Sequence, residues 1–196
     1  MIERTSLRTS DGETLEARWD SPSEPSGVVV LCHPHPHQGG SMMAPLLIAM
    51  TTRLNERGFS VLRFNFRGTG ASTGELSDGK AEVLDVAAAV EEAKGTGLGL
   101  HLSGWSFGAA IALRWLSAEG DPIPYAGIAP PTADLPEQLP PGPKRIVVGT
   151  RDQVVDIEGI RLYAEEHSID LLLTPGDHFF HGRGKKIGNL VAQGFE

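Results

Sequence analysis

The stretch that most constrains how this chain can fold runs from Leu98 to Leu116, where a short apolar strand leads into an alanine-rich helix. Between the two lies Gly104-Trp-Ser-Phe-Gly108, a match to the pattern G-x-S-x-G. Glycine at both ends of this pattern permits a turn so tight that a β-carbon would collide with the backbone. In this interpretation the turn lifts the hydroxyl of Ser106 clear of the sheet, beside the N-terminus of the helix. A simpler alternative is that Ser106 only caps the helix.

Strands and helices are expected to alternate along most of the chain. The expected strands cover residues 27–32, 59–66, 125–129, 144–149 and 169–174, and the expected helices cover 43–57, 80–94, 157–167 and 184–193. This alternation predicts an α/β fold with a mostly parallel, doubly wound sheet. Alternating segments around Asp11-Gly12, residues 6–9 and 13–19, predict an antiparallel hairpin at its edge. We expect one domain over residues 1–196, in which the proline-rich stretch 130–143 is a loop.

Charge and cysteine content exclude several classes of protein. The formal net charge is −8 and no basic run is present, which argues against binding to nucleic acid or to an anionic membrane. No apolar run approaches the roughly 20 residues that cross a bilayer, and the N-terminus has no apolar signal core. The single cysteine, Cys32, lies in an apolar run and is expected to be buried and unpaired. These features predict a cytoplasmic protein.

Two further polar residues follow predicted strands, and in an open α/β sheet such positions gather at one edge. Asp152 follows the strand at 144–149, and His178 follows the last strand. A serine hydroxyl is a weak nucleophile that needs a base, an imidazole can accept and return its proton, and a carboxylate orients the imidazole. The order Ser106, Asp152, His178 is the order that a nucleophile-elbow fold requires. The sequence therefore predicts a catalytic triad of these three residues.

Each triad residue has an alternative. Asp152 could cap the turn into the following helix, although Asp156 is better placed to do so. His181 lies three residues after His178 and could be the base instead. We favour His178 because it is nearer the end of its strand, where a short loop holds geometry better.

The loop Cys32-His-Pro-His-Pro-His-Gln-Gly-Gly40 follows the first parallel strand. Acyl transfer requires two N–H donors for the oxyanion, and the residue after the nucleophile, Phe107, can supply one. Proline has no N–H, so the second donor is expected to be the backbone N–H of His35, with His37 as the next candidate. The alternative is a metal site of His33, His35 and His37, but no acidic or cysteine partner stands at ligand spacing.

No cofactor is expected. The glycine-rich turn at 68–74 has its third glycine one place late for a dinucleotide fingerprint, and no acidic residue follows at the required distance. The segment Gly184-Lys-Lys186 lacks the upstream glycine and the downstream hydroxyl of a phosphate-binding loop. The metal alternative above is also disfavoured, so we predict neither a cofactor nor a metal.

The chain resembles the small, cap-less bacterial α/β-hydrolases of the dienelactone-hydrolase-like type. Five segments carry the resemblance in the order found in that family: His33-Pro-His-Pro36, Phe64–Glu75, Gly104–Gly108, Gly149–Asp152 and Asp177–Arg183. The resemblance implies an α/β-hydrolase fold, with Ser106 as nucleophile, Asp152 as acid and His178 as base. The short, proline-rich stretch 130–143 stands where many relatives carry a helix or a lid, which implies an open site for small or flexible substrates. Dienelactone hydrolases use cysteine where this chain has serine, so their substrate is not expected here.

The resulting hypothesis is a serine hydrolase that cleaves small carboxylic esters or thioesters through an acyl-enzyme. Two alternatives stay open at this point. The same fold could carry a lyase or an acyltransferase, because fold does not fix chemistry. The protein could also be a catalytically idle binding protein.

Overall fold

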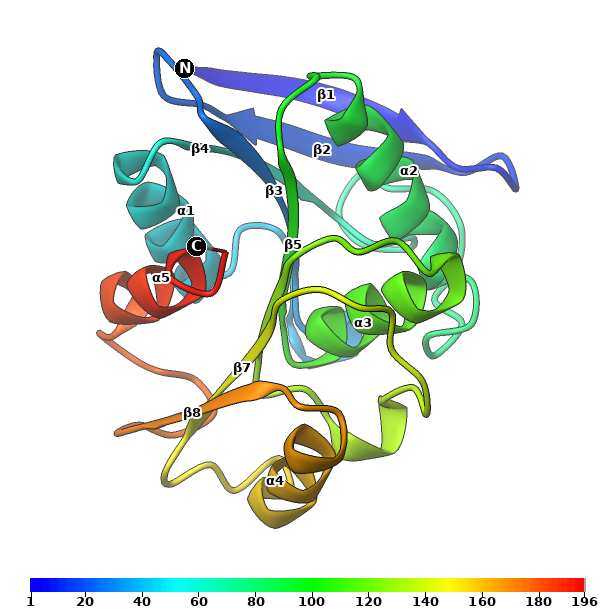
Figure 1. The fold of residues 1–196 in the computed structure, drawn as a ribbon. Helices are drawn as coiled ribbons and strands as arrows, with labels where there is room; N and C mark the ends of the chain where they lie inside the picture. Colours follow the sequence, from blue (N-terminus) through cyan, green and yellow to red (C-terminus); the bar gives the residue numbers. More distant parts are fainter. Residues whose placement is uncertain (196) are drawn as a thin grey trace.

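A computed structural model describes residues 1–195 of the chain, and within these residues eight strands form one mixed sheet (Figure 1). The strands are β1 (Ile2–Arg8), β2 (Thr14–Asp20), β3 (Gly27–Cys32), β4 (Phe59–Phe64), β5 (Leu100–Trp105), β6 (Tyr125–Ile128), β7 (Lys144–Gly149) and β8 (Asp170–Thr174). The helices are α1 (Pro45–Glu56), α2 (Glu82–Lys94), α3 (Phe107–Glu119), α4 (Ile157–Glu166) and α5 (Gly184–Ala192), with short 3₁₀ turns η1 (Pro36–Gln38) and η2 (Thr132–Asp134).

The sheet order is β1-β2-β4-β3-β5-β6-β7-β8. β1 and β2 form an antiparallel hairpin, β2 pairs antiparallel with β4, and the pairs from β4 to β8 are all parallel. Helices α1 and α5 pack together on one face, and α2 and α3 cover the other (Figure 1). The predicted doubly wound α/β fold with an antiparallel hairpin at its edge is therefore confirmed. The parallel strands bring their carboxyl ends to one rim of the sheet.

Two helices begin later than the apolar periodicity predicts. The helix expected from residue 43 begins at Pro45, since proline fits the first turn, where its missing N–H is not needed. The helix expected from residue 80 begins at Glu82. The buried Glu82 carboxylate accepts hydrogen bonds from the N–H groups of Ser77 and Gly79, which holds the preceding residues in a turn.

The first strand is longer than expected. Residues 6–9 were the expected strand, whereas β1 begins at Ile2 and ends at Arg8. Its first residues lie on the exposed edge of the sheet, and only Leu7, opposite Leu15 on β2, is fully buried. Periodicity could not show the start of this strand, because an exposed edge does not impose alternation of polar and apolar residues.

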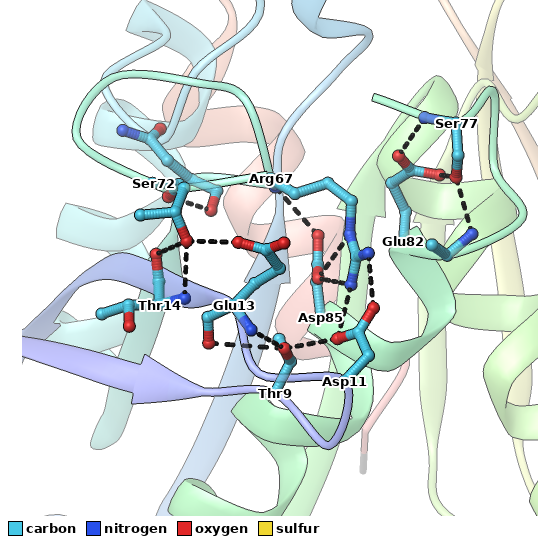
Figure 2. Close-up of polar contacts among 12 residues, drawn as sticks. Thr9, Asp11, Glu13, Thr14, Arg67, Ser72, Ser77, Glu82 and Asp85 are labelled. Carbon is cyan, nitrogen blue, oxygen red and sulfur yellow. Dashed lines mark hydrogen bonds and ion pairs between the residues drawn. The ribbon is translucent and has the colours of Figure 1, made fainter. Parts of the chain in front are cut away.

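A cluster of ionic contacts joins the hairpin to the body of the protein (Figure 2). Arg67, in the loop after β4, contacts the buried carboxylate of Asp85 on α2 at 2.7 Å and the exposed carboxylate of Asp11 at the hairpin tip at 2.8 Å. The backbone N–H of Arg67 also donates to Asp85. The guanidinium of Arg67 lowers the pKa of Asp11 to about 2. We call these three residues the Arg67 brace.

Candidate active site

Ser106 occupies the sharp turn between β5 and α3. Its backbone has φ 54° and ψ −120°, in a region where residues with a β-carbon are strained. A β-carbon added at Gly104 would lie 2.6 Å from the nitrogen of Ala109, and one added at Gly108 would lie 2.3 Å from the carbonyl oxygen of His33. Both glycines are therefore required, because the backbone approaches them too closely for a β-carbon.

The side chain of Ser106 makes no capping hydrogen bond to α3, so the helix-cap alternative does not account for this serine.

Asp152 and His178 meet at the rim of the sheet, after β7 and β8. The Nδ1 atom of His178 lies 2.9 Å from Oδ2 of Asp152, and both side chains are buried. The other oxygen of Asp152 accepts the N–H groups of Val154 and Val155, at 2.8 and 3.1 Å. Asp152 thus caps a local turn with one oxygen and holds the imidazole with the other. Asp156 stands at the N-cap of α4 but makes no capping hydrogen bond with its side chain.

Backbone contacts hold the loops that carry Asp152 and His178 close together. The N–H of Arg151 donates to the carbonyl oxygen of Gly176 at 2.9 Å. A β-carbon at Gly149 would lie only 2.5 Å from that same oxygen, so glycine is needed where the two loops touch. The indole N–H of Trp105 donates to the backbone oxygen of His178 at 3.1 Å, which ties the histidine loop to the strand that ends in Ser106.

Ser106 and His178 line one cavity of about 280 Å³. Its other walls come from the loop after β3, the start of α1 and the segment after His178; the lining includes Pro34, Gln38, Gly39, Gly40, Ala44, Pro45, Leu46, Trp105, Phe179 and His181. A larger hollow of about 740 Å³ lies at the opposite, amino end of the strands beside Trp19 and Glu92, and neither a histidine nor a cysteine lines it among the described residues. The cavity at Ser106 combines a serine hydroxyl on a strained turn with a histidine.

The comparisons with known proteins identify the family and the fold. Residues 23–144, more than half of the chain, match the model of the Hydrolase_4 family, described as serine aminopeptidase, S33. The chain belongs to this hydrolase family.

Solved structures extend the likeness of this hydrolase over the whole fold. An α/β serine hydrolase without a lid from Xanthomonas campestris superposes with a TM-score of 0.88 at 28% identity, covering 98% of this chain and 93% of that one. An α/β serine hydrolase homologue from Coxiella burnetii superposes with a TM-score of 0.89 at 29% identity, covering 99% of this chain and 97% of that one. An uncharacterized protein of Rickettsia prowazekii (strain Madrid E) is 27% identical over 195 residues, which span 90% of this chain and 82% of that protein. The resemblance to small bacterial hydrolases without a lid is confirmed, whereas the narrower likeness to dienelactone hydrolases stays a prediction.

The loop after β3 of this hydrolase has one unengaged N–H group between residues 34 and 40, all of which the structure describes. Pro34 and Pro36 have none, and the N–H of His37 donates to the ring of His35 at 3.2 Å. The N–H groups of residues 38–40 donate to backbone oxygens within the loop. Only the N–H of His35 has no acceptor there, and the ring of His35 packs edge-on against Phe107, with centroids 4.8 Å apart.

His33, the first histidine of this loop, is fully buried and has both ring nitrogens engaged. Its Nε2 accepts the N–H of Phe66 at 3.0 Å, and its Nδ1 lies 2.6 Å from the carbonyl oxygen of Pro34. Nδ1 therefore carries the proton and donates it. Burial lowers the pKa of His33 to about 4, so the ring is neutral at pH 7. Within residues 1–195, no three His, Cys, Asp or Glu side chains converge as a metal site.

Sequence reasoning missed several residues that shape the site. Trp105 is a variable position of the G-x-S-x-G pattern, yet its indole fixes the histidine loop. Pro45 and Leu46 line the cavity although they belong to a helix that the sequence identifies only as amphipathic. Phe179, which follows His178 directly, is 50% exposed. The pair Phe179-Phe180 directly after a candidate base, outside the predicted helices and strands, is a sequence signal that could have been used. None of the helices among the described residues is long and apolar enough to cross a membrane.

Proposed function

We propose that this hydrolase cleaves small carboxylic esters or thioesters through an acyl-enzyme on Ser106, with His178 as base and Asp152 as the orienting acid. The observation that carries the proposal is the 2.9 Å contact between Asp152 and His178 beside the cavity that Ser106 shares with the histidine. Because Asp152 occupies Nδ1, proton transfer falls to Nε2. The strained turn at Ser106 and the family of serine hydrolases to which the chain belongs support the same chemistry.

The mechanism follows from these contacts. Nε2 of His178 takes the proton of the Ser106 hydroxyl while the Ser106 oxygen attacks the carbonyl carbon of the substrate. The tetrahedral intermediate collapses when the protonated His178 gives that proton to the leaving alcohol or thiol. Water then attacks the acyl-serine while His178 takes one of the protons of that water. The second tetrahedral intermediate collapses when His178 gives this proton to the Ser106 oxygen, and the acid is released. The carboxylate of Asp152 stabilises the imidazolium in both halves of the reaction.

Two backbone N–H groups are proposed to bind the oxyanion. Phe107 follows the nucleophile at the start of α3, where helix N–H groups have no partner within the helix. The N–H of His35 is the second donor, which is supported by its lack of an acceptor and by the contact of its ring with Phe107. Such a donor contributes about 10²- to 10³-fold to turnover.

The proposal is tested by labelling Ser106 with a fluorophosphonate probe at neutral pH and measuring the intact mass, together with release of p-nitrophenol from p-nitrophenyl acetate. We expect a mass shift and turnover for the wild type and neither for Ser106→Ala. Absence of both labelling and turnover in the wild type would contradict the proposal and favour an idle binding protein. Product analysis with an added alcohol acceptor separates hydrolysis from acyl transfer.

The oxyanion assignment has its own test, because a backbone group is proposed to act. His35→Ala keeps the N–H, so its kcat for p-nitrophenyl acetate should stay within about threefold of the wild type. His35→Pro removes the N–H and should lower kcat by about 10²- to 10³-fold. Equal losses for alanine and proline would mean that the side chain, not the backbone, is the active group.

A further inference from the structure

A second cavity adjoins the one that contains Ser106. It has a volume of about 400 Å³ and shares four lining residues with the first: Pro45, Leu46, Phe179 and His181. From these residues it continues to Ala49 on α1 and to Gly184 and Lys185 at the start of α5. The two cavities are therefore adjacent, and together they extend from Ser106 to the junction of α1 and α5. We call the second cavity the α1 groove.

Most residues that line the α1 groove are apolar or glycine, and His181 and Lys185 are its polar members. Pro45, Leu46 and Ala49 form the side that belongs to α1, and Phe179 and Phe180 contribute from the histidine loop. Helices α1 and α5 pack so closely at this end that a β-carbon at Gly184 would lie 2.4 Å from that of Ala49. Among the described residues, no carboxylate lines either cavity. Such walls favour an apolar chain over a cationic or strongly polar group.

The direction of the groove indicates which part of an ester would enter it. Residues of the loop 34–40, which carries the proposed oxyanion donor, line the cavity at Ser106, but none of them lines the α1 groove. The groove instead continues past Phe179 and His181, on the side of His178. Because His178 must give its proton to the leaving oxygen, that oxygen and the chain attached to it lie on this side of the serine.

We propose that the α1 groove binds the apolar chain of the leaving alcohol or thiol, so that the enzyme selects its substrates by the leaving group more than by the acid. This inference rests on the function proposed above. Pro45 and Ala49 are four residues apart on α1, which corresponds to about 6 Å along the helix axis. With carbon–carbon bonds of about 1.5 Å, this length accommodates about four to five extended methylene groups.

Two ester series test the proposal with the wild-type protein. One series holds the acid as acetate and lengthens the alcohol from ethyl to butyl and hexyl; the other holds ethanol and lengthens the acid in the same steps. We expect kcat/KM to rise about two- to fourfold per methylene group in the alcohol series, as expected for partial to full burial of each group. In the acid series it should vary by less than about threefold. A rise confined to the acid series, or no rise in either, would overturn the inference.

Substitutions in the groove sharpen the test. Ala49→Phe fills the distal part and should lower kcat/KM for hexyl acetate at least about tenfold, while ethyl acetate stays within about twofold. Ile48→Phe is the matched control, because Ile48 is exposed on the adjacent position of α1 and lines neither cavity. Ile48→Phe should leave kcat/KM unchanged for both hexyl and ethyl acetate.

Ala49 contacts α5, so Ala49→Phe could disturb folding, and Phe179→Ala provides an independent test on an exposed side chain. It removes one wall of the groove and should reduce the ratio of kcat/KM for hexyl to ethyl acetate about fivefold. An unchanged ratio in Phe179→Ala would contradict the inference. If the wild type hydrolyses ethyl acetate and Ser106 is labelled but the alcohol series is flat, the inference fails while the proposed function stands. If no ester is hydrolysed and Ser106 is not labelled, the proposed function itself fails.

Discussion

Two loops at the same rim of the sheet each carry a buried histidine, and the two histidines are engaged differently. His33, after β3, uses both ring nitrogens in contacts with backbone groups, and burial holds its pKa at about 4. His178, after β8, uses Nδ1 in a contact with Asp152, and among residues 1–195 its Nε2 has no hydrogen-bond partner. Both rings are shielded from solvent.

The difference shows how one side chain serves structure in one loop and suits chemistry in the other. A ring whose two nitrogens are both bound to backbone joins two loops and has no atom left for a substrate. A ring that lines a cavity, with one nitrogen held by a carboxylate and the other without a partner, has a fixed tautomer and one site for proton transfer. Burial alone would not distinguish the two histidines; the number of occupied nitrogens does.

The largest expected effect comes from changing the partner of His178. Asp152→Asn should lower kcat for p-nitrophenyl acetate by about 10⁴-fold, because the amide favours the wrong imidazole tautomer. The amide oxygen can still accept the N–H groups of Val154 and Val155, so the thermal midpoint should stay within a few degrees of the wild type. A kcat within tenfold of the wild type would show that Asp152 does not orient the base.

The next effect concerns His33 and is expected in stability rather than in activity. The unfolded chain binds a proton to this residue near pH 6.5, whereas the folded chain binds one only near pH 4. Stability contributed by neutral His33 is therefore fully present above pH 6.5 and falls by about 3 kcal/mol as the pH drops to 4.

His33→Gln tests this expectation, because glutamine can accept the N–H of Phe66 but does not titrate. Urea unfolding of both proteins at pH 7 and pH 4.5 should show a steeper loss for the wild type. The kcat at pH 7 should stay within about threefold, since no ring atom of His33 is proposed to touch the substrate. Parallel losses of stability in the two proteins would contradict the assignment of His33 as a neutral structural residue.

The smallest effect is expected for His181, the alternative base of the sequence analysis. It is exposed and stacks on Phe179, with ring centroids 5.7 Å apart, and it makes no contact with Asp152. His181→Ala should leave kcat for p-nitrophenyl acetate within about threefold, whereas His178→Ala should lower it about as much as Asp152→Asn does. If the two variants exchange these outcomes, His181 is the base, and His178 is the wrong residue to compare with His33.

The sequence carried much of the fold because local patterns specify it. Glycines at 104 and 108 with a strand before and a helix after predicted the turn at Ser106, and the structure has that turn. The alternation of strands and helices predicted the parallel sheet. The expectation that Asp152 and His178 lie near each other followed from both residues ending strands, and they are in contact; their catalytic roles stay a proposal.

Features that depend on distant backbone were out of reach of the sequence. The repeated histidines of residues 33–37 suggest equivalent roles, yet His33 binds the backbone of Phe66, which is 33 residues away. The α1 groove combines α1 with residues 179–185, and neither segment shows by itself that the other covers it. Such pairings arise only when the sheet places the segments side by side, so no local pattern records them.

The Arg67 brace has a consequence for how short this protein could be made. The hairpin of β1 and β2 lies at the edge of the sheet and is far from Ser106 in the sequence, so it looks dispensable for activity. Deleting residues 1–20 would leave the buried guanidinium with Asp85 as its remaining carboxylate and would uncover the pairing edge of β4, which β2 covers. An uncovered edge of this kind recruits strands from other molecules. A truncated version would thus be expected to precipitate rather than to work as a minimal enzyme.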